Sequence, residues 1–302
     1  MRNAFIDELI LQARLDPSIF LLVGDLGYGV VEPFAREFPN RFLNAGVAEQ
    51  NMMGMAAGLS SSGYKVFVYS IGNFPTLRCL EQIRNDVCYH NLNVSIVSIG
   101  AGLSYGNLGY SHHAIEDIGI LRCLPGIKIY SPADPLETRM SLRHSISTSG
   151  PSYFRLGKSG EKEIFTEVTS KFPKSTFFGE NSDTIVITTG SILSEVLLAR
   201  ELLSKIGVGV KVMSVPILKP IEISIEDLGN AKHIVVVEEH SLAGGLSSLV
   251  CEEIVTLGIS CKVMKLALPD SIQHNIGSQK YLRSQYGIDS ESIFRVIQAI
   301  QN

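Results

Sequence analysis

The chain has 302 residues, 26 Lys and Arg against 30 Asp and Glu, and a formal net charge of −4. This length suggests two domains of ordinary size, each able to bury its own core. The mild charge and scattered basic residues exclude the strongly basic patterns of nucleic-acid and anionic-membrane binding.

The longest apolar runs, such as 234–237, are far too short to span a bilayer, and the acidic, amphipathic N-terminus is unlike a signal peptide. The five cysteines are odd in number and lack metal-type spacing. We therefore expect reduced thiols in a cytoplasmic protein.

Short apolar segments alternate with helical patterns along residues 1–165. The wholly apolar run 19–23 is typical of a strand that is covered on both faces. The predicted strands are 19–23, 42–44, 66–69, 94–99, 128–130 and 153–156, and the predicted helices are 3–15, 48–59, 75–87, 114–121 and 135–145. Such alternation predicts a mostly parallel sheet with helices on both faces.

The segment 160–183 is rich in Lys, Thr, Ser and Glu without a sustained period, which indicates a linker. A second series follows, with predicted strands at 184–188, 208–213, 234–237 and 261–266 and helices at 191–206 and 245–257. We predict an α/β fold of two doubly wound domains, the second one smaller. The boundaries are 1–165 for the first domain, 166–182 for the linker and 183–302 for the second domain.

Glu49 stands at the start of a predicted helix that is apolar almost all round and should be buried. A buried carboxylate is costly unless it is paired or neutralised. Glu49 either complements the positive end of the helix or is kept protonated to polarise a bound heterocycle. The local residues alone favour the first interpretation.

Gly-Val-Ala-Glu-Gln-Asn at residues 46–51, followed by Met-Ala-Ala-Gly-Leu, resembles the signature of the pyrimidine-binding domain of transketolases. More broadly, it is similar to the transketolase-like thiamine diphosphate enzymes. Four further similarities follow in the same order, at residues 72–84, 111–117, 124–134 and 237–246. Together they cover nearly the whole chain.

The resemblance implies that the Glu49 carboxyl group binds a ring nitrogen of the cofactor aminopyrimidine and favours the tautomer that acts as a base. Such a carboxyl group works best when desolvated, because burial favours the neutral form of an acid. Phe74 matches an aromatic residue that packs on the pyrimidine ring, although Ile71 is an alternative contact and Phe74 could equally be a core residue. Asp25 resembles an acid of the cofactor cleft, and a turn-forming role is the alternative.

His112 aligns with the family histidine near the reacting carbon, where it could donate to a carbonyl oxygen or shuttle a proton. Arg78 and Lys158 match cationic positions that bind phosphorylated or polyol substrates, and simple surface solvation is the alternative for both. Lysine lacks the bidentate fork of the arginine that is commoner at position 158. We also assign His113 to substrate binding. A metal pair of His112 and His113 lacks a third ligand, so no metal ligand is assigned.

The glycine-rich segment 100–106 fails the dinucleotide pattern, because Tyr105 stands where the third glycine is required. We predict a flexible loop over a site. Gly100 replaces a histidine that is frequent in transketolases, Leu108 replaces an acid that recognises a donor hydroxyl, and Tyr110 replaces a proline. Leu108 cannot accept that hydrogen bond, which predicts an unusual sugar or aldehyde substrate.

The family motif for diphosphate and magnesium, Gly-Asp-Gly followed by a distant Asn, is absent, and residues 24–26 do not fit it. We therefore expect a separate N-terminal transketolase subunit to bind the diphosphate and Mg²⁺ in an α₂β₂ assembly, with this chain inactive alone. The second domain is expected to be structural, with residues 239–240 and 244–245 near a subunit contact.

The expected function is that of one subunit of a thiamine diphosphate-dependent transketolase, which moves a two-carbon ketol unit from a ketose to an aldehyde or aldose. The alternatives are the β-subunit of a 2-oxo acid decarboxylase, dehydrogenase or pyruvate-using synthase, and a non-catalytic partner subunit.

Overall fold

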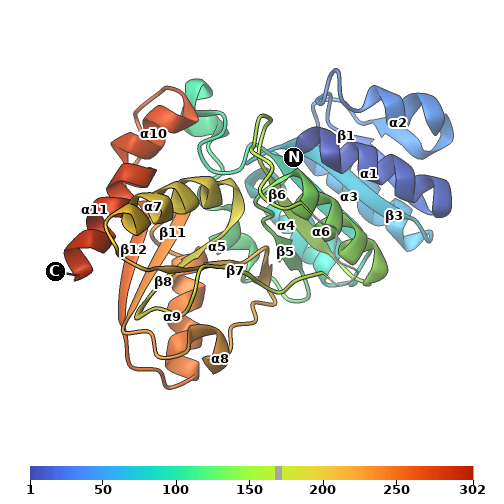
Figure 1. Cartoon of the computed structure of the whole chain (residues 1–302). Coiled ribbons are helices and arrows are strands. Elements are labelled where there is room, and N and C mark those ends of the chain that lie inside the picture. The colour runs from blue at the N-terminus through green and yellow to red at the C-terminus, as the bar shows by residue number, and fades with distance from the viewer. Residues whose placement is uncertain (167–171, 302) are drawn as a thin grey trace.

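The computed structural model describes residues 1–166 and 172–301. Two sheets lie side by side, each flanked by helices (Figure 1). The first has seven strands in the order β10-β5-β6-β4-β3-β1-β2, and the second has five in the order β12-β11-β8-β9-β7. Within the described residues, β10 pairs antiparallel with β5 and β7 pairs antiparallel with β9, and the other strand pairs are parallel. The expectation of two α/β domains is confirmed.

The first domain alternates strands and helices. Its strands are β1 (Ile19–Val23), β2 (Phe42–Asn44), β3 (Lys65–Ile71), β4 (Val94–Ile99), β5 (Lys128–Tyr130) and β6 (Ser152–Leu156). Its helices are α1 (Arg2–Leu15), α2 (Glu32–Glu37), α3 (Glu49–Ser61), α4 (Leu80–Gln82), α5 (Asp117–Leu121) and α6 (Pro135–Ser147).

The second half of the chain follows the same scheme. Its strands are β7 (Thr176–Phe178), β8 (Thr184–Thr188), β9 (Lys211–Ser214), β10 (Ile217–Lys219), β11 (His233–Ser241) and β12 (Lys262–Leu268). Its helices are α7 (Leu193–Lys205), α8 (Ile225–Leu228), α9 (Leu246–Thr256), α10 (Gln279–Gln285) and α11 (Ser290–Gln301).

Helices cover both faces of the first sheet. Phe5 of α1, Phe34 of α2 and Leu142 of α6 pack in one apolar cluster, whereas Met52 of α3 and Ile118 of α5 belong to another. All five residues of β1 are buried, as its wholly apolar sequence predicts.

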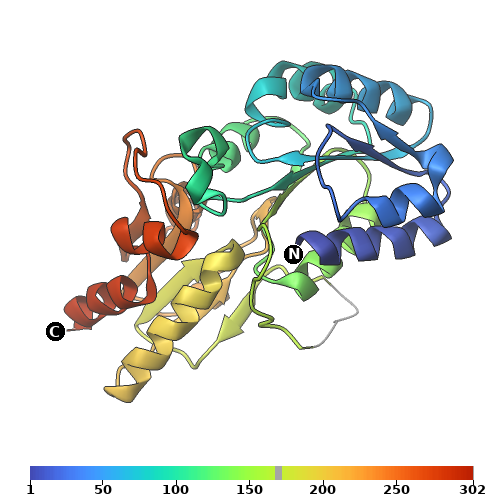
Figure 2. The ribbon, with the colours of Figure 1, turned by 90° about the horizontal axis from the view of Figure 1, so that it is seen from above.

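The two domains share an apolar core. The cluster beneath α3 continues into the second domain through residues such as Ile187 of β8 and Val250 of α9. The opposite face of the second sheet is covered by α7 and α11. The N-terminus lies near the junction of the domains and the C-terminus at the far end of the second domain (Figures 1 and 2).

Strand β10 was not predicted, and it links the two halves of the chain. It follows β9 of the second sheet but pairs antiparallel with β5 of the first sheet, with Ile217 opposite Tyr130. The first sheet is therefore completed by a strand from beyond residue 182. Sequence reasoning also missed α2, β7, α8, α10 and α11.

Two predicted helices differ from the structure. The segment 75–87 begins only at Leu77 as a 3₁₀ turn and becomes a π-helix over Ile83–Cys88, after a turn in which the Thr76 hydroxyl donates to Gly72 O. The predicted helix 114–121 is shortened to α5, because Ala114 exchanges backbone hydrogen bonds with Gly102 and is drawn into extended pairing.

Within the predicted linker 166–182, residues 167–171 lie outside the described residues, and Thr176–Phe178 forms β7. In the described parts of the chain, no helix is long and apolar enough to cross a membrane. The cytoplasmic location stays a prediction.

Candidate active site

The candidate residues gather at one edge of the first sheet. Asp25 follows β1, the turn before Glu49 follows β2, Phe74 follows β3 and Lys158 follows β6. These strands run parallel, so their carboxyl ends meet at the edge where ligands bind in open α/β sheets.

Glu49 is the first residue of α3 and is only 3% exposed. Gly46 makes the preceding turn with a φ of +72°, and its N–H donates to Asn44 Oδ1 at 3.0 Å. Ala48 has no polar side chain with which to cap the helix, so the Glu49 carboxylate supplies the negative charge that a helix N-terminus favours.

Arg78 pairs with Glu49 instead of standing free for a substrate. Its Nη1 donates to Glu49 Oε2 at 2.7 Å, and its guanidinium carbon lies 5.0 Å from the centre of the Phe74 ring. The Arg78 side chain is 49% exposed, so it can move away from the acid without disturbing the core. Arg78 therefore covers one oxygen of Glu49 from the solvent side.

The other carboxyl oxygen, Oε1 of Glu49, accepts no hydrogen bond from the described residues. A buried carboxyl group with a free oxygen beside an aromatic ring fits a flat heterocycle that carries a ring nitrogen. Glu49 and Phe74 therefore fit the pyrimidine half of thiamine diphosphate. Ile71 is the last residue of β3, three positions before Phe74, and stays the alternative contact for the ring.

His112 continues the site beyond Phe74. The two ring centroids are 5.3 Å apart in an edge-to-face arrangement, and His112 Nδ1 is 3.0 Å from the Ser111 hydroxyl. The imidazole is half-buried, so it keeps access to a ligand.

Tyr105 and Lys158 extend the line of contacts beyond His112. The Tyr105 ring lies edge-on to His112 with centroids 6.3 Å apart, and Lys158 Nζ is 5.0 Å from the centre of the Tyr105 ring. Burial raises the pKa of the Tyr105 phenol, which therefore stays protonated at neutral pH.

We call the resulting set of neighbouring side chains the catalytic row. In order of contact it contains Glu49, Arg78, Phe74, His112, Tyr105 and Lys158. Sequence reasoning missed Tyr105 as a member. The only signal was its place among the glycines before His112.

Asp25 lies outside the catalytic row. Its φ is +57°, its N–H donates to Asn44 Oδ1 at 3.0 Å, and its carboxylate accepts from Asn44 Nδ2 and the Tyr28 hydroxyl. These hydrogen bonds lower the pKa of the Asp25 carboxyl group. The geometry favours the turn-forming alternative for this residue.

His113 lies outside the catalytic row, and its part in substrate binding stays a prediction. Its side chain is wholly buried, and neither ring nitrogen has a hydrogen-bond partner among the described residues. Burial lowers the pKa of His113, which keeps the imidazole neutral.

The loop that carries His112 is held by a buried ion pair. Arg155 of β6 donates from Nε to Asp117 Oδ2 at 2.8 Å, and from Nη2 to the carbonyl oxygens of Ala114 and Glu239, each at 2.8 Å. Tyr153 donates to the same Asp117 oxygen at 2.6 Å. The first domain, the loop and β11 of the second domain therefore meet at one guanidinium group.

The second domain braces this loop within the chain. Ser241 N donates to Ile115 O at 2.8 Å, and Gly119 N donates to His240 Nε2 at 3.3 Å. Gly244 packs against the backbone of Gly119. Residues 239–240 and 244–245 were expected near a subunit contact, and the structure places them at the contact between the two domains of one chain.

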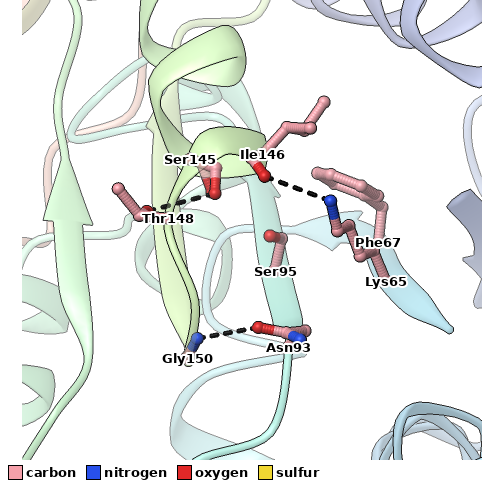
Figure 3. A pocket seen from close by; sticks show the side chains of 8 residues that line it. All are labelled: Lys65, Phe67, Asn93, Ser95, Ser145, Ile146, Thr148 and Gly150. Atoms are coloured by element: carbon pink, nitrogen blue, oxygen red, sulfur yellow. Dashed lines mark hydrogen bonds between the residues drawn. The ribbon is translucent and has the colours of Figure 1, made fainter. Parts of the chain in front are cut away.

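A separate small hollow lies at the opposite edge of the first sheet, at the amino ends of β3 and β4 (Figure 3). Lys65 Nζ donates to Ile146 O at 3.2 Å, and Gly150 N donates to Asn93 Oδ1 at 2.7 Å. Its polar groups already satisfy one another, so it offers little to a ligand. Among the described residues, no three His, Cys, Asp or Glu side chains are grouped to hold a metal ion.

Comparison with known proteins agrees with this geometry. Residues 1–161 match the family model of the transketolase pyrimidine-binding domain, and residues 176–293 match that of the transketolase C-terminal domain. A protein of Actinobacillus succinogenes, named as one of the subunits of an apulose-4-phosphate transketolase, is 34% identical over 97% of this chain and 96% of its own length. A 6-deoxy-6-sulfo-D-fructose transketolase subunit of Clostridium sp. (strain MSTE9) is 31% identical over 98% and 92%.

A solved structure described as a split gene transketolase, inactive beta4 tetramer, superimposes with a TM-score of 0.87 at 33% identity, over 99% of this chain and 96% of that one. The two family models follow each other along the sequence and together span both sheets. The chain therefore belongs to the transketolase family, in which it combines a pyrimidine-binding domain with a transketolase C-terminal domain.

Proposed function

We propose that this chain is the pyrimidine-binding subunit of a split, thiamine diphosphate-dependent transketolase. The observation that carries the proposal is the catalytic row itself. A buried acid at a helix start is followed in space by an aromatic ring, a histidine and a lysine. The relatives that match nearly end to end are named as subunits of transketolases, which supports the same role here.

Thiamine diphosphate, when bound, supplies the nucleophilic carbon that attacks a ketose carbonyl. Glu49 would share a proton with the pyrimidine nitrogen through Oε1, and the ion pair of Oε2 with Arg78, which favours the charged carboxylate, would be weakened as that proton is shared. Phe74 presents its ring to the pyrimidine. His112 donates a proton to the substrate carbonyl oxygen and takes it back when the ketol unit leaves. Lys158 attracts the anionic end of a sugar phosphate.

We assign the diphosphate and Mg²⁺ to a separate N-terminal subunit in an α₂β₂ assembly. The related split transketolase chain is described as an inactive tetramer, and we expect this chain to be inactive alone as well. The relatives named for apulose 4-phosphate and a sulfo-sugar support a specialised ketose or acceptor. Leu108, which is 52% exposed and cannot accept a hydroxyl hydrogen bond, supports the same conclusion.

Calorimetric titration with thiamine diphosphate and Mg²⁺ tests the proposal. This chain, the candidate N-terminal partner encoded beside it and their mixture are titrated separately. We expect tight binding by the mixture alone, weakened at least tenfold by Glu49→Ala. Glu81→Ala, which removes an exposed acid from α4, is the matched control and should leave the affinity unchanged.

Tight binding by this chain alone would refute the split site, and an unchanged affinity in Glu49→Ala would refute the role of Glu49. Turnover then distinguishes the reaction. Ketol transfer from a ketose to an aldehyde supports a transketolase, whereas release of carbon dioxide from pyruvate without ketol transfer would indicate a 2-oxo acid enzyme.

A further inference from the structure

Gly100 and Tyr105 fit each other at the end of β4. An added Cβ at Gly100 would lie well inside 3.0 Å of Cδ2 and Cε2 of the Tyr105 ring. Atoms at that separation overlap, so one of the two groups must move. Gly100 also has a φ of +97°, a conformation that residues with a Cβ rarely adopt. A side chain at position 100 and the observed position of Tyr105 therefore exclude each other.

The backbone around Tyr105 is held from both sides. Tyr105 O accepts from Leu108 N at 2.8 Å, and the next residue, Gly106, accepts from Gly277 N of the second domain at 3.3 Å. The Tyr105 ring also packs against the apolar cluster of the first domain. The ring is thus part of the fixed wall of the site.

Tyr105 lies at the far end of the catalytic row from Glu49. Contacts run from Glu49 through Arg78 and Phe74 to His112, and only then to Tyr105 and Lys158. If the pyrimidine binds at Glu49 and the reacting carbon lies at His112, then Tyr105 and Lys158 face the part of the substrate that is distant from the cofactor. That part differs most between sugars of different chain length.

We propose that Tyr105, accommodated by Gly100, determines the substrate chain length that this site accepts. The Tyr105 ring fills the space that a side chain at position 100 would otherwise occupy. The Lys158 ammonium lies 5.0 Å from the centre of this ring. The same ring is in edge-on contact with His112, with centroids 6.3 Å apart. Because the ring lies beyond His112 as seen from Glu49, short phosphorylated aldehydes fit in front of it and longer ones collide with it. This inference rests on the proposed transketolase function.

The fit between the two residues is tested on the chain alone by thermal unfolding of Gly100→Ala, Tyr105→Ala and the double variant. The backbone cost of alanine at a positive φ is common to both backgrounds and cancels in the cycle. We expect Gly100→Ala to lower the Tm by at least about 2 °C more in the wild-type background than in Tyr105→Ala. Equal shifts in the two backgrounds would overturn the steric pairing.

Chain-length selection is tested in the reconstituted complex with glyceraldehyde 3-phosphate, erythrose 4-phosphate and ribose 5-phosphate as acceptors. All three carry a phosphate, so any loss of Lys158 positioning affects each of them and largely cancels in ratios of kcat/KM. We expect Tyr105→Ala to raise the ratio of ribose 5-phosphate to glyceraldehyde 3-phosphate about tenfold, since pocket size commonly discriminates by this factor.

Tyr105→Phe keeps the ring and should retain the wild-type ratio. Tyr89→Ala, which removes a tyrosine that is 81% exposed near the opposite edge of the sheet, is the matched control and should also retain it. A ratio in Tyr105→Ala within twofold of wild type, or the same change in Tyr105→Phe, would overturn the inference. Absence of ketol transfer by the wild-type complex with every acceptor would instead overturn the proposed function, and this inference with it.

Discussion

Replacing Arg155 by methionine should destabilise the folded chain strongly, because it leaves Asp117 as a buried charge without its cation. Arg155 is 3% exposed and Asp117 is wholly buried. Among the described residues the Oδ1 atom of Asp117 already lacks a hydrogen-bond partner, so Oδ2 and its contact with Arg155 carry the stabilisation of the carboxylate. The substitution also removes the donor to the carbonyl oxygens of Ala114 and Glu239.

Breaking a buried ion pair by removing one partner costs about 3–5 kcal/mol. We therefore expect Arg155→Met to lower the free energy of unfolding by about that amount. The double variant Arg155→Met/Asp117→Asn removes the orphaned charge as well and should recover at least about 1 kcal/mol of the loss.

Urea unfolding of the chain, followed by far-UV circular dichroism, measures these changes. Arg14→Met is the matched control, because the pair of Arg14 with Glu37 is largely exposed and solvent screening leaves it little effect on stability. If Arg155→Met costs no more than Arg14→Met, or if the double variant is as unstable as the sum of its single changes, the buried pair does not hold the junction as described.

A second substitution of Arg155 distinguishes an effect on the position of His112 from an effect on cofactor binding. Arg155 holds Ala114 O, two residues from His112, but does not touch Glu49. A milder variant, Arg155→Lys, should therefore reduce kcat of the reconstituted complex by about tenfold or more while leaving its affinity for thiamine diphosphate within twofold. Equal losses in kcat and cofactor affinity would show a general loss of structure instead.

Three further predictions concern separate features. Burial raises the pKa of Glu137 to about 8 from an ordinary 4.5, so this acid is protonated in the folded chain. The stability of the fold that depends on this proton is fully present below about pH 4.5 and is lost as the pH rises towards 8. Tm values measured across this window should therefore fall less in Glu137→Gln than in wild type. Arg78→Ala should strengthen thiamine diphosphate binding by the complex up to about fivefold in calorimetry, because the half-exposed ion pair no longer has to be weakened when Glu49 shares a proton with the cofactor, and weaker binding would contradict this. Gly102→Ala should destabilise the chain by about 1–3 kcal/mol in urea, since its Cβ would lie 2.7 Å from a carboxylate oxygen of β11, whereas Gly29→Ala, with a similar φ and no described atom within 4 Å, measures the backbone cost alone.

Much of the fold could be predicted because the buried strands are short apolar runs with unmistakable ends. Strand β1 matches its prediction at both ends. By contrast, β10 has only three residues and pairs with the sheet of the other domain, so no local pattern reveals its partner. The π-helix over Ile83–Cys88 is equally invisible, because its residues follow an ordinary helical pattern.

Residues of the candidate site could be predicted where a single side chain matches a family motif. They could not be predicted where the shape of the site depends on two residues that meet only in the folded chain. Glu49 and His112 were identified by resemblance to a family motif, and the structure brings them into one row. Tyr105 could not be identified this way, because its ring occupies the space left by the missing side chain of Gly100. It also contacts Lys158, which is 53 positions further along the sequence. The burial of the His113 side chain was not predicted either, since adjacency in sequence to His112 says nothing about which way a side chain turns.

The second domain contributes no side chain to the catalytic row, yet it fixes the loop from which His112 and Tyr105 project. Its β11 accepts from Arg155 and donates to Ile115, and Gly277 donates to the residue after Tyr105. Each of these contacts uses a backbone group of the second domain, so it constrains position without adding chemistry. We therefore expect the second domain to act on the reaction only by fixing the position of this loop. Changes at these contacts should alter turnover and acceptor preference while the pyrimidine site around Glu49 stays intact.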